Sequence, residues 1–241
     1  MQECDTEKTQ ELAELLGVES GQRDEQWKIR FYDIVPRAAL AVPDSQGMVG
    51  PDGFVYLILE LPQPDSSFAG YSLVKLLDHL LASGLGLMVS SGGTVPDWVF
   101  SYGCLWSYRE FGHFEVSTAS PPGSSVEVTA AGGGLEKHTY TEDHEVIVGQ
   151  PTDLVLPQYA RRTIRAFFQE RLKVSNPAVF LLADPDRQPK QALVFSVFPE
   201  DFDSQESFAR VMKLLTWFLP PHYELSAISR NSGMAAAFRP L

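Results

Sequence analysis

The sequence predicts an α+β fold of two lobes. Apolar residues recur at helical spacing in several segments, and short apolar runs of strand length alternate with these segments. A stretch rich in Ser, Thr, Pro and Gly divides the chain, and 241 residues suffice for two lobes of domain size. We therefore expect an N-terminal lobe at residues 1–116, a Gly/Pro/Ser-rich linker at 117–143 and a C-terminal lobe at 144–241.

The N-terminal lobe has three segments with the apolar periodicity of a helix. They cover residues 5–16, 24–35 and 71–81. Gly17 and Gly84 are suited to end the first and third helices, and Pro36 prevents the second from continuing. Extended structure is expected at 39–42, 54–61 and 85–89.

The aromatic segment 98–111 fits two kinds of secondary structure. Trp98, Tyr102 and Trp106 share even parity with neighbouring aromatics, which fits one face of a strand. A helix is equally compatible with Trp98, Tyr102 and Arg109, and Gly103 is able to break either element. The role of these aromatics also has two interpretations. If they are exposed they would form a binding surface, and if they are buried they would belong to the core.

The C-terminal lobe has the order α-β-β-α-β-β. The six elements are expected at residues 159–172, 178–182, 192–198, 204–218, 223–229 and 234–238, after a further strand at 144–148. Ser204 is placed to cap the second helix. This order favours a mainly antiparallel sheet covered by two helices.

Charge is divided unevenly along the chain. The net charge is -12, and residues 1–150 contain 8 Lys and Arg against 22 Asp and Glu, whereas residues 151–241 contain 11 against 9. An acidic surface repels phosphate backbones, so we expect no nucleic-acid partner. The asymmetry is consistent with solubility and attraction between the lobes, or with a cationic partner for the first.

The sequence predicts a cytoplasmic protein without a membrane span. No apolar run approaches the roughly 18 residues that a spanning helix needs, and residues 1–8 lack the basic and apolar regions of a signal peptide. Cys4 and Cys104 are the only cysteines, too few for a disulfide-stapled secreted domain. Both are expected to be free thiols.

Short motifs in both lobes resemble the enhanced serine sensitivity protein SseB family. The C-terminal lobe has Val-Gly-Gln-Pro at 148–151, Leu-Pro at 156–157 and Ala-Phe-Arg-Pro at 237–240. The N-terminal lobe has Arg-Phe-Tyr at 30–32, Ala-Val-Pro at 41–43 and Leu-Met-Val-Ser-Ser-Gly-Gly at 87–93. The resemblance implies a bacterial, two-domain, cytoplasmic protein. It supplies no catalytic residues, because the family has no settled mechanism.

Three groups of residues have the types needed for chemistry, but none has the required spacing. Cys104 and His113 are too far apart in sequence to indicate a nucleophile and its base. The turn 90–93 lacks the lysine and helix of a phosphate loop. The remaining group, which does not have the spacing of a zinc site, is His138, Glu142, Asp143 and His144. We therefore expect no catalytic residue, no metal and no cofactor.

Arginines on the first C-terminal helix are the other binding candidates. Arg161, Arg162 and Arg165 are expected on the face opposite the apolar stripe, where they could contact carboxylates. Such a face can also be merely solvated or dock onto the acidic lobe. The leading hypothesis is a non-enzymatic protein that binds another protein. The alternative is an enzyme or small-molecule binder with its site between the lobes.

Overall fold

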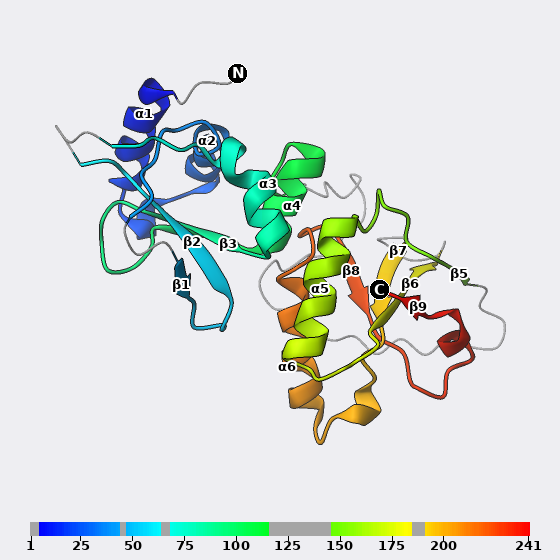
Figure 1. The fold of residues 1–241 in the computed structure, drawn as a ribbon. Coiled ribbons are helices and arrows are strands. Elements are labelled where there is room, and N and C mark those ends of the chain that lie inside the picture. The colour runs from blue at the N-terminus through cyan, green and yellow to red at the C-terminus, as the bar shows by residue number, and fades with distance from the viewer. Residues whose placement is uncertain (1–4, 44–46, 64–67, 116–145, 185–190) are drawn as a thin grey trace. The chain divides into compact units, whose positions relative to one another are not determined.

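A computed structural model shows an α+β chain of two compact units, Met1–Glu115 and Val116–Leu241 (Figure 1). The structure describes residues 5–43, 47–63, 68–115, 146–184 and 191–241. The division between the units falls one residue before the expected end of the first lobe. The linker expected at 117–143 lies outside the described residues.

The first unit has a mixed four-stranded sheet in the order β1-β2-β3-β4. Strands β2 and β3 are parallel and joined through α3, whereas β1 and β4 are antiparallel to their neighbours. The elements are α1 (Thr6–Leu16), η1 (Ser20–Gln22), α2 (Glu25–Ile34), β1 (Gly47–Val49), β2 (Val55–Glu60), α3 (Leu73–Ser83), β3 (Gly86–Ser90), β4 (Trp98–Phe100) and α4 (Tyr102–Phe111). The three expected helices and the expected strands at 54–61 and 85–89 are present, whereas the extended piece expected at 39–42 forms only isolated β-bridges through Leu40 and Ala41, and β1 was not expected.

Local sequence signals set the ends of these helices. The carboxylate of Asp5 accepts hydrogen bonds from the backbone N–H groups of Glu7 and Lys8, and Asp24 caps α2 in the same way. Gly84 ends α3 in the left-handed conformation, with a φ of 68°, which glycine adopts without steric cost. These caps explain why the sequence located the helix boundaries to within two residues.

The aromatic segment 98–111 contains both of the elements that its pattern allowed. Strand β4 ends at Phe100, and the hydroxyl of Ser101 accepts a hydrogen bond from the backbone N–H of Cys104 to begin α4. Gly103 lies inside the helix and breaks neither element. A Ser N-cap between two aromatic groups was therefore the deciding signal.

The second unit has a sheet in the order β5-β6-β7-β8, with β9 also paired to β6. All its pairings are antiparallel except that of β7 with β8. The elements are β5 (Ile147–Gly149), α5 (Gln158–Glu170), β6 (Ala178–Ala183), β7 (Gln191–Phe195), η2 (Pro199–Asp201), α6 (Gln205–Thr216), β8 (Glu224–Ser226), η3 (Gly233–Ala237) and β9 (Arg239–Pro240). The expected mainly antiparallel sheet with two helices is confirmed.

Helices α5 and α6 pack side by side on the sheet of the second unit (Figure 1). The ring of Phe168 on α5 lies 5.8 Å from that of Phe195 on β7, and Phe167 contacts Phe218 just after α6. On the opposite side, Phe180 and its neighbours contact Phe238, after η3. Both faces of this sheet are thus covered by apolar side chains.

The expected strand at 234–238 is wrong, because these residues form most of η3. Ser232 accepts a hydrogen bond from the backbone N–H of Met234, and three consecutive alanines follow, which favour helical conformations. The final strand is β9, which has only two residues.

No helix in the described parts of the chain is long and apolar enough to cross a membrane. The longest, α5, has 13 residues, whereas a spanning helix needs about 20.

Candidate functional site

Arg161 does not project outward as its helical position suggested. Its guanidinium donates to the carbonyl oxygens of Leu156 and Pro151, and its side chain is only 13% exposed. The residue therefore holds the segment before α5 against the helix and is not part of an open cationic face.

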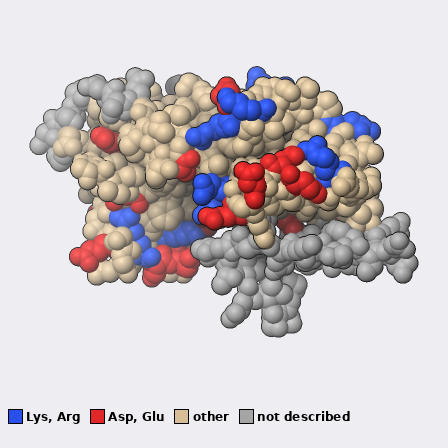
Figure 2. All heavy atoms as spheres, turned by 90° about the horizontal axis from the view of Figure 1, so that it is seen from below, with Lys and Arg blue, Asp and Glu red and all other residues tan. Residues whose placement is uncertain are grey.

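Arg162 and Arg165 are exposed on α5, as expected. The solvated face of α5 therefore has two of the three expected arginines, because Arg161 turns away from it. Figure 2 shows one face of the molecule, on which basic and acidic side chains lie beside one another.

The aromatic candidates belong mainly to the core. Tyr102 and Trp106 are fully buried, since their spacing of four residues places both on the inner face of α4. Trp98 is half-buried and its ring packs against those of Trp27 and Phe31. Tyr102 and Trp106 therefore cannot contact a partner, and of the three only Trp98 has exposed surface.

Cys104 does not have the surroundings of a nucleophile. Burial raises the pKa of its thiol, whereas a reactive cysteine needs a lowered pKa. Cys104 lies in the first turn of α4 and His113 follows its last, so roughly 10 Å of helix separates them. The two residues do not form a catalytic pair.

The turn at 90–93 is occupied by a carboxylate of the chain itself. Asp97 accepts hydrogen bonds from the backbone N–H and the hydroxyl of Ser91, at 2.8 and 2.7 Å. A second anion would be repelled there, so the turn is structural. The remaining candidates, His138, Glu142, Asp143 and His144, lie outside the described residues, and the described ones contain no cluster of His, Cys, Asp and Glu that could hold a metal.

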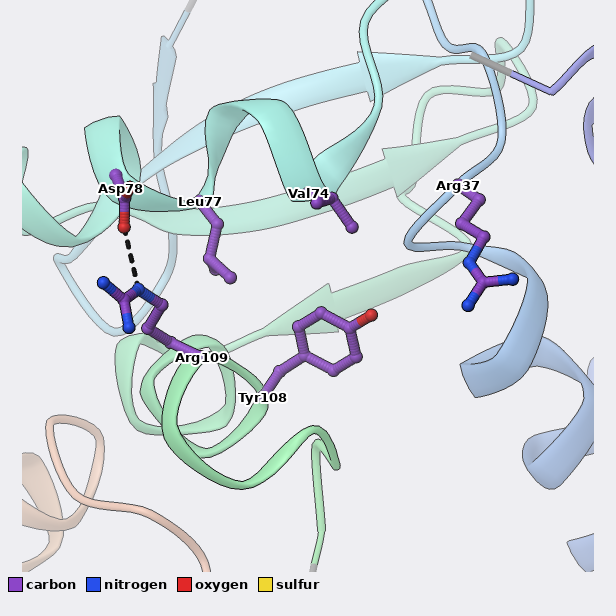
Figure 3. Close-up of a pocket in the computed structure, with 6 residues that line it drawn as sticks. All are labelled: Arg37, Val74, Leu77, Asp78, Tyr108 and Arg109. Atoms are coloured by element: carbon purple, nitrogen blue, oxygen red, sulfur yellow. Dashed lines mark hydrogen bonds and ion pairs between the residues drawn. The ribbon is translucent and has the colours of Figure 1, made fainter. Parts of the chain in front are cut away.

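A cavity in the first unit brings together residues that the sequence did not connect. Its volume is about 320 Å³, at the lower end of the range of ligand pockets. Arg37 lies at one end and Arg109 at the other, and Tyr108 lies between them with its hydroxyl directed toward Arg37 (Figure 3). Val74 and Leu77 of α3 form the opposite wall.

Backbone hydrogen bonds fix Arg37 at this position. Its N–H donates to the carbonyl of Ile34, and its own carbonyl accepts from the N–H of Asp5. The carbonyl of the preceding Pro36 accepts from the N–H of Val74, in the first turn of α3. The end of α2 is thereby attached to the start of α3, which brings Arg37 to the cavity.

The other side of the cavity is held by α4. The ring of Tyr108 stacks on Phe114 with centroids 4.5 Å apart, and Arg109 forms an ion pair of 2.8 Å with Asp78 on α3. The next residue after Phe114 is Glu115, whose carboxylate accepts from the Tyr32 hydroxyl at 2.9 Å. The segment that supports Tyr108 is therefore attached to α2.

The cavity offers one unpaired cation and one neutral donor. Among the described residues the Arg37 guanidinium has no hydrogen bond or ion pair, whereas Arg109 is paired with Asp78. Burial raises the pKa of the Tyr108 phenol, and the charge of Asp33 adds to this effect while Arg37 opposes it. Tyr108 is therefore protonated near neutral pH and can donate a hydrogen bond. Together these groups suit a single carboxylate with a small apolar part.

Sequence reasoning missed this site because its residues are separated by up to 72 positions. Only Tyr108 and Arg109 lay in a segment already marked as unusual, and no motif connects them to Arg37. The sequence signals that could have indicated the site were the helix stop at Pro36 and the arginine directly after it.

A second cavity, also of about 320 Å³, lies in the second unit. Leu181, Leu193 and Val155 line its apolar part, and His222 and Tyr223 line its polar part. Burial lowers the pKa of His222, so the imidazole is mostly neutral at neutral pH. This cavity has no described cationic side chain in its lining.

Comparisons with protein-family models, with curated proteins and with solved structures found no match to this chain. The resemblance to the SseB family stays a prediction from short motifs.

Proposed function

We propose that this chain is a non-enzymatic, cytoplasmic bacterial protein that binds another protein, and that a carboxylate of the partner docks in the cavity of the first unit. The observation that supports this proposal is the unpaired Arg37 guanidinium beside the Tyr108 hydroxyl and an apolar wall. An arginine presents N–H donors in a fork that matches the two oxygens of a carboxylate.

The cavity favours a carboxylate over phosphates and large cofactors. Its volume of about 320 Å³ suits a small group, not a dinucleotide. Charge gives the same result: Arg109 is paired with Asp78, and the negative charge of Asp33 also acts on Tyr108, so the net positive charge of the site is at most the single charge of Arg37. A doubly charged phosphate would be only half neutralised.

Binding is also more consistent with the surroundings than catalysis. The protonated Tyr108 and the guanidinium of Arg37 stabilise a bound anion, but neither is a base that could remove a proton at neutral pH. The Cys104 thiol does not line the cavity, and burial raises its pKa, so it is a poor nucleophile at neutral pH. The cavity thus recognises a group without transforming it.

Fluorescence polarisation with two labelled peptides tests this function. One peptide ends in Gly-Gly-Leu with a free carboxylate, and the other is amidated and contains an internal Leu-Glu. Arg37→Glu is compared with Arg30→Glu, a matched control, because Arg30 is exposed on α2 outside the cavity. Both variants change the net charge equally.

At least one peptide is expected to bind, and Arg37→Glu should weaken it by about 10- to 100-fold, the value of hydrogen bonds to a charged group. Arg30→Glu should change the affinity less than about 3-fold, as a charge outside the contact does. An equal loss in both variants, or no binding of either peptide at millimolar concentration, would contradict the proposal.

A further inference from the structure

We propose that the cavity of the first unit recognises the free C-terminus of a polypeptide: the terminal carboxylate on Arg37 and Tyr108, the last side chain on Val74 and Leu77, and the N–H of the last peptide group on Asp78. This inference rests on the proposed function and names the chemical group that the site takes.

The end of the cavity at Arg37 provides the carboxylate site. The guanidinium and the Tyr108 hydroxyl lie on the same side of the cavity, and the hydroxyl is directed toward Arg37 (Figure 3). One carboxylate oxygen can accept from the guanidinium while the other accepts from the phenol. Both donors are attached to fixed backbone, through the hydrogen bonds of Arg37 and the stacking of Tyr108 on Phe114.

The middle of the cavity provides an apolar site of limited size. Leu77 is 95% buried and Val74 is half-buried, so their surfaces toward the cavity are small. The ring of Tyr108 faces them from α4 (Figure 3). One aliphatic side chain adjacent to the carboxylate fits this space, and in a polypeptide the terminal residue is the one that has both groups on the same carbon.

The far end of the cavity suits a peptide N–H because it offers a carboxylate acceptor. The Asp78 carboxylate, 83% exposed, has free acceptor sites for a peptide N–H beyond its bond to Arg109. Arg109 is paired with both Asp78 and Glu110, so its role is to hold the Asp78 carboxylate in place and not to bind the peptide itself. A glutamate or aspartate side chain on an internal residue would not place its peptide group in this order.

Binding of four probes to the full chain tests the inference: acetyl-Gly-Gly-Leu as the free acid, the same peptide as the amide, an amidated peptide with an internal Leu-Glu, and isovalerate. The free acid is expected to bind at least about 10-fold more tightly than the amide and the internal acid, because only it presents a charged acceptor at Arg37 in register with the side chain. The affinity of the free acid should also exceed that of isovalerate, which lacks the peptide group.

Two variants test the roles of the individual groups. Tyr108→Phe keeps the ring on Phe114 and should weaken binding of the free acid by about 10-fold or more through loss of one hydrogen bond to a charged group. Asp78→Ala should lower the ratio of peptide affinity to isovalerate affinity by about 5-fold, since only the peptide uses that acceptor. Asp78 is highly exposed, so folding should be unaffected.

The possible outcomes separate this inference from the proposed function. If the internal acid binds as tightly as the free acid and both depend on Arg37, recognition of a C-terminus is wrong while partner docking at the cavity stands. If isovalerate matches the peptide, the site takes a small acid and the C-terminus is again excluded. If no probe binds in an Arg37-dependent way, both proposals fail.

Discussion

Replacement of Arg23 by Ala is expected to destabilise the first unit strongly. Arg23 is 12% exposed, and its guanidinium donates to the carbonyls of Leu16 and Val18 and to Asp97, with 3.0 Å to the Asp97 carboxylate. It also lies over the ring of Trp27 at 4.8 Å. One side chain thus joins the end of α1, the start of α2 and the turn before β4.

The expected loss follows from these contacts. Removing one partner of a buried ion pair costs about 3–5 kcal/mol, because the other charge is left without compensation. Asp97 keeps its bonds to Ser91 and is 15% exposed, so we take the lower end, about 3 kcal/mol. With urea slopes of about 1–3 kcal/mol per M, the midpoint should fall by about 1–3 M.

Tryptophan fluorescence during urea unfolding measures this loss, because three of the four tryptophans lie in the first unit. Arg23→Lys should recover only part of it, since an ammonium cannot reach several acceptors in a plane. Arg30→Ala, on the exposed face of α2, is the control and should stay within about 0.5 kcal/mol of the parent. A similarly small change for Arg23→Ala would refute the reasoning.

Further predictions concern packing, thiol reactivity and acid stability. Gly86→Ala should cost about 1–3 kcal/mol in urea unfolding, because the new Cβ would lie 2.5 Å from the Tyr56 ring, whereas at Gly93 the nearest atom is 3.7 Å away and Ala should be nearly neutral. Cys104 in the folded protein should react with iodoacetamide far more slowly than Cys104 in protein unfolded by guanidinium, since burial raises the pKa of its thiol. Equal alkylation rates of the folded and unfolded protein in mass spectrometry would contradict this. Burial opposes the pKa shift of Asp97, but hydrogen bonds from its partners lower the folded pKa below the unfolded value of about 3.9, so its stabilisation is present above about pH 4 and is lost as pH falls through the folded pKa. Asp97→Asn should therefore flatten the decline in urea midpoint below pH 4, and an unchanged decline would exclude this assignment.

Local sequence signals predicted most of the secondary structure. Helix caps and glycine stops act within a few residues, so Gly84 and Ser204 predicted their helix ends correctly, and the helices expected from residues 5 and 24 begin directly after the capping Asp5 and Asp24. The strand expected at 234–238 failed because apolar spacing alone cannot distinguish a short strand from a 3-10 helix. Strand β1 was missed since three residues are too few for a pattern.

The candidate site depends on long-range contacts that no local pattern contains. Arg37 reaches the cavity only because the carbonyl of Pro36 accepts a hydrogen bond from Val74, 38 positions later. Arg161 shows the converse: helical periodicity placed it on the outer face, but its long side chain turns back to carbonyls before α5. The direction of a flexible arginine is set by the acceptors within its reach, which periodicity does not reveal.

The most direct test of partner docking at Arg37 is a methyl NMR titration of the full chain with acetyl-Gly-Gly-Leu. Val74 and Leu77 line the cavity, so their methyl signals should shift in a saturable way as the peptide is added. The methyl signals of Leu12, which is fully buried in α1, should not shift. Arg37→Glu should remove the shifts, and Arg30→Glu should leave them unchanged. Shifts confined to Val155 and Leu193 in the second unit, or persisting in Arg37→Glu, would contradict the account.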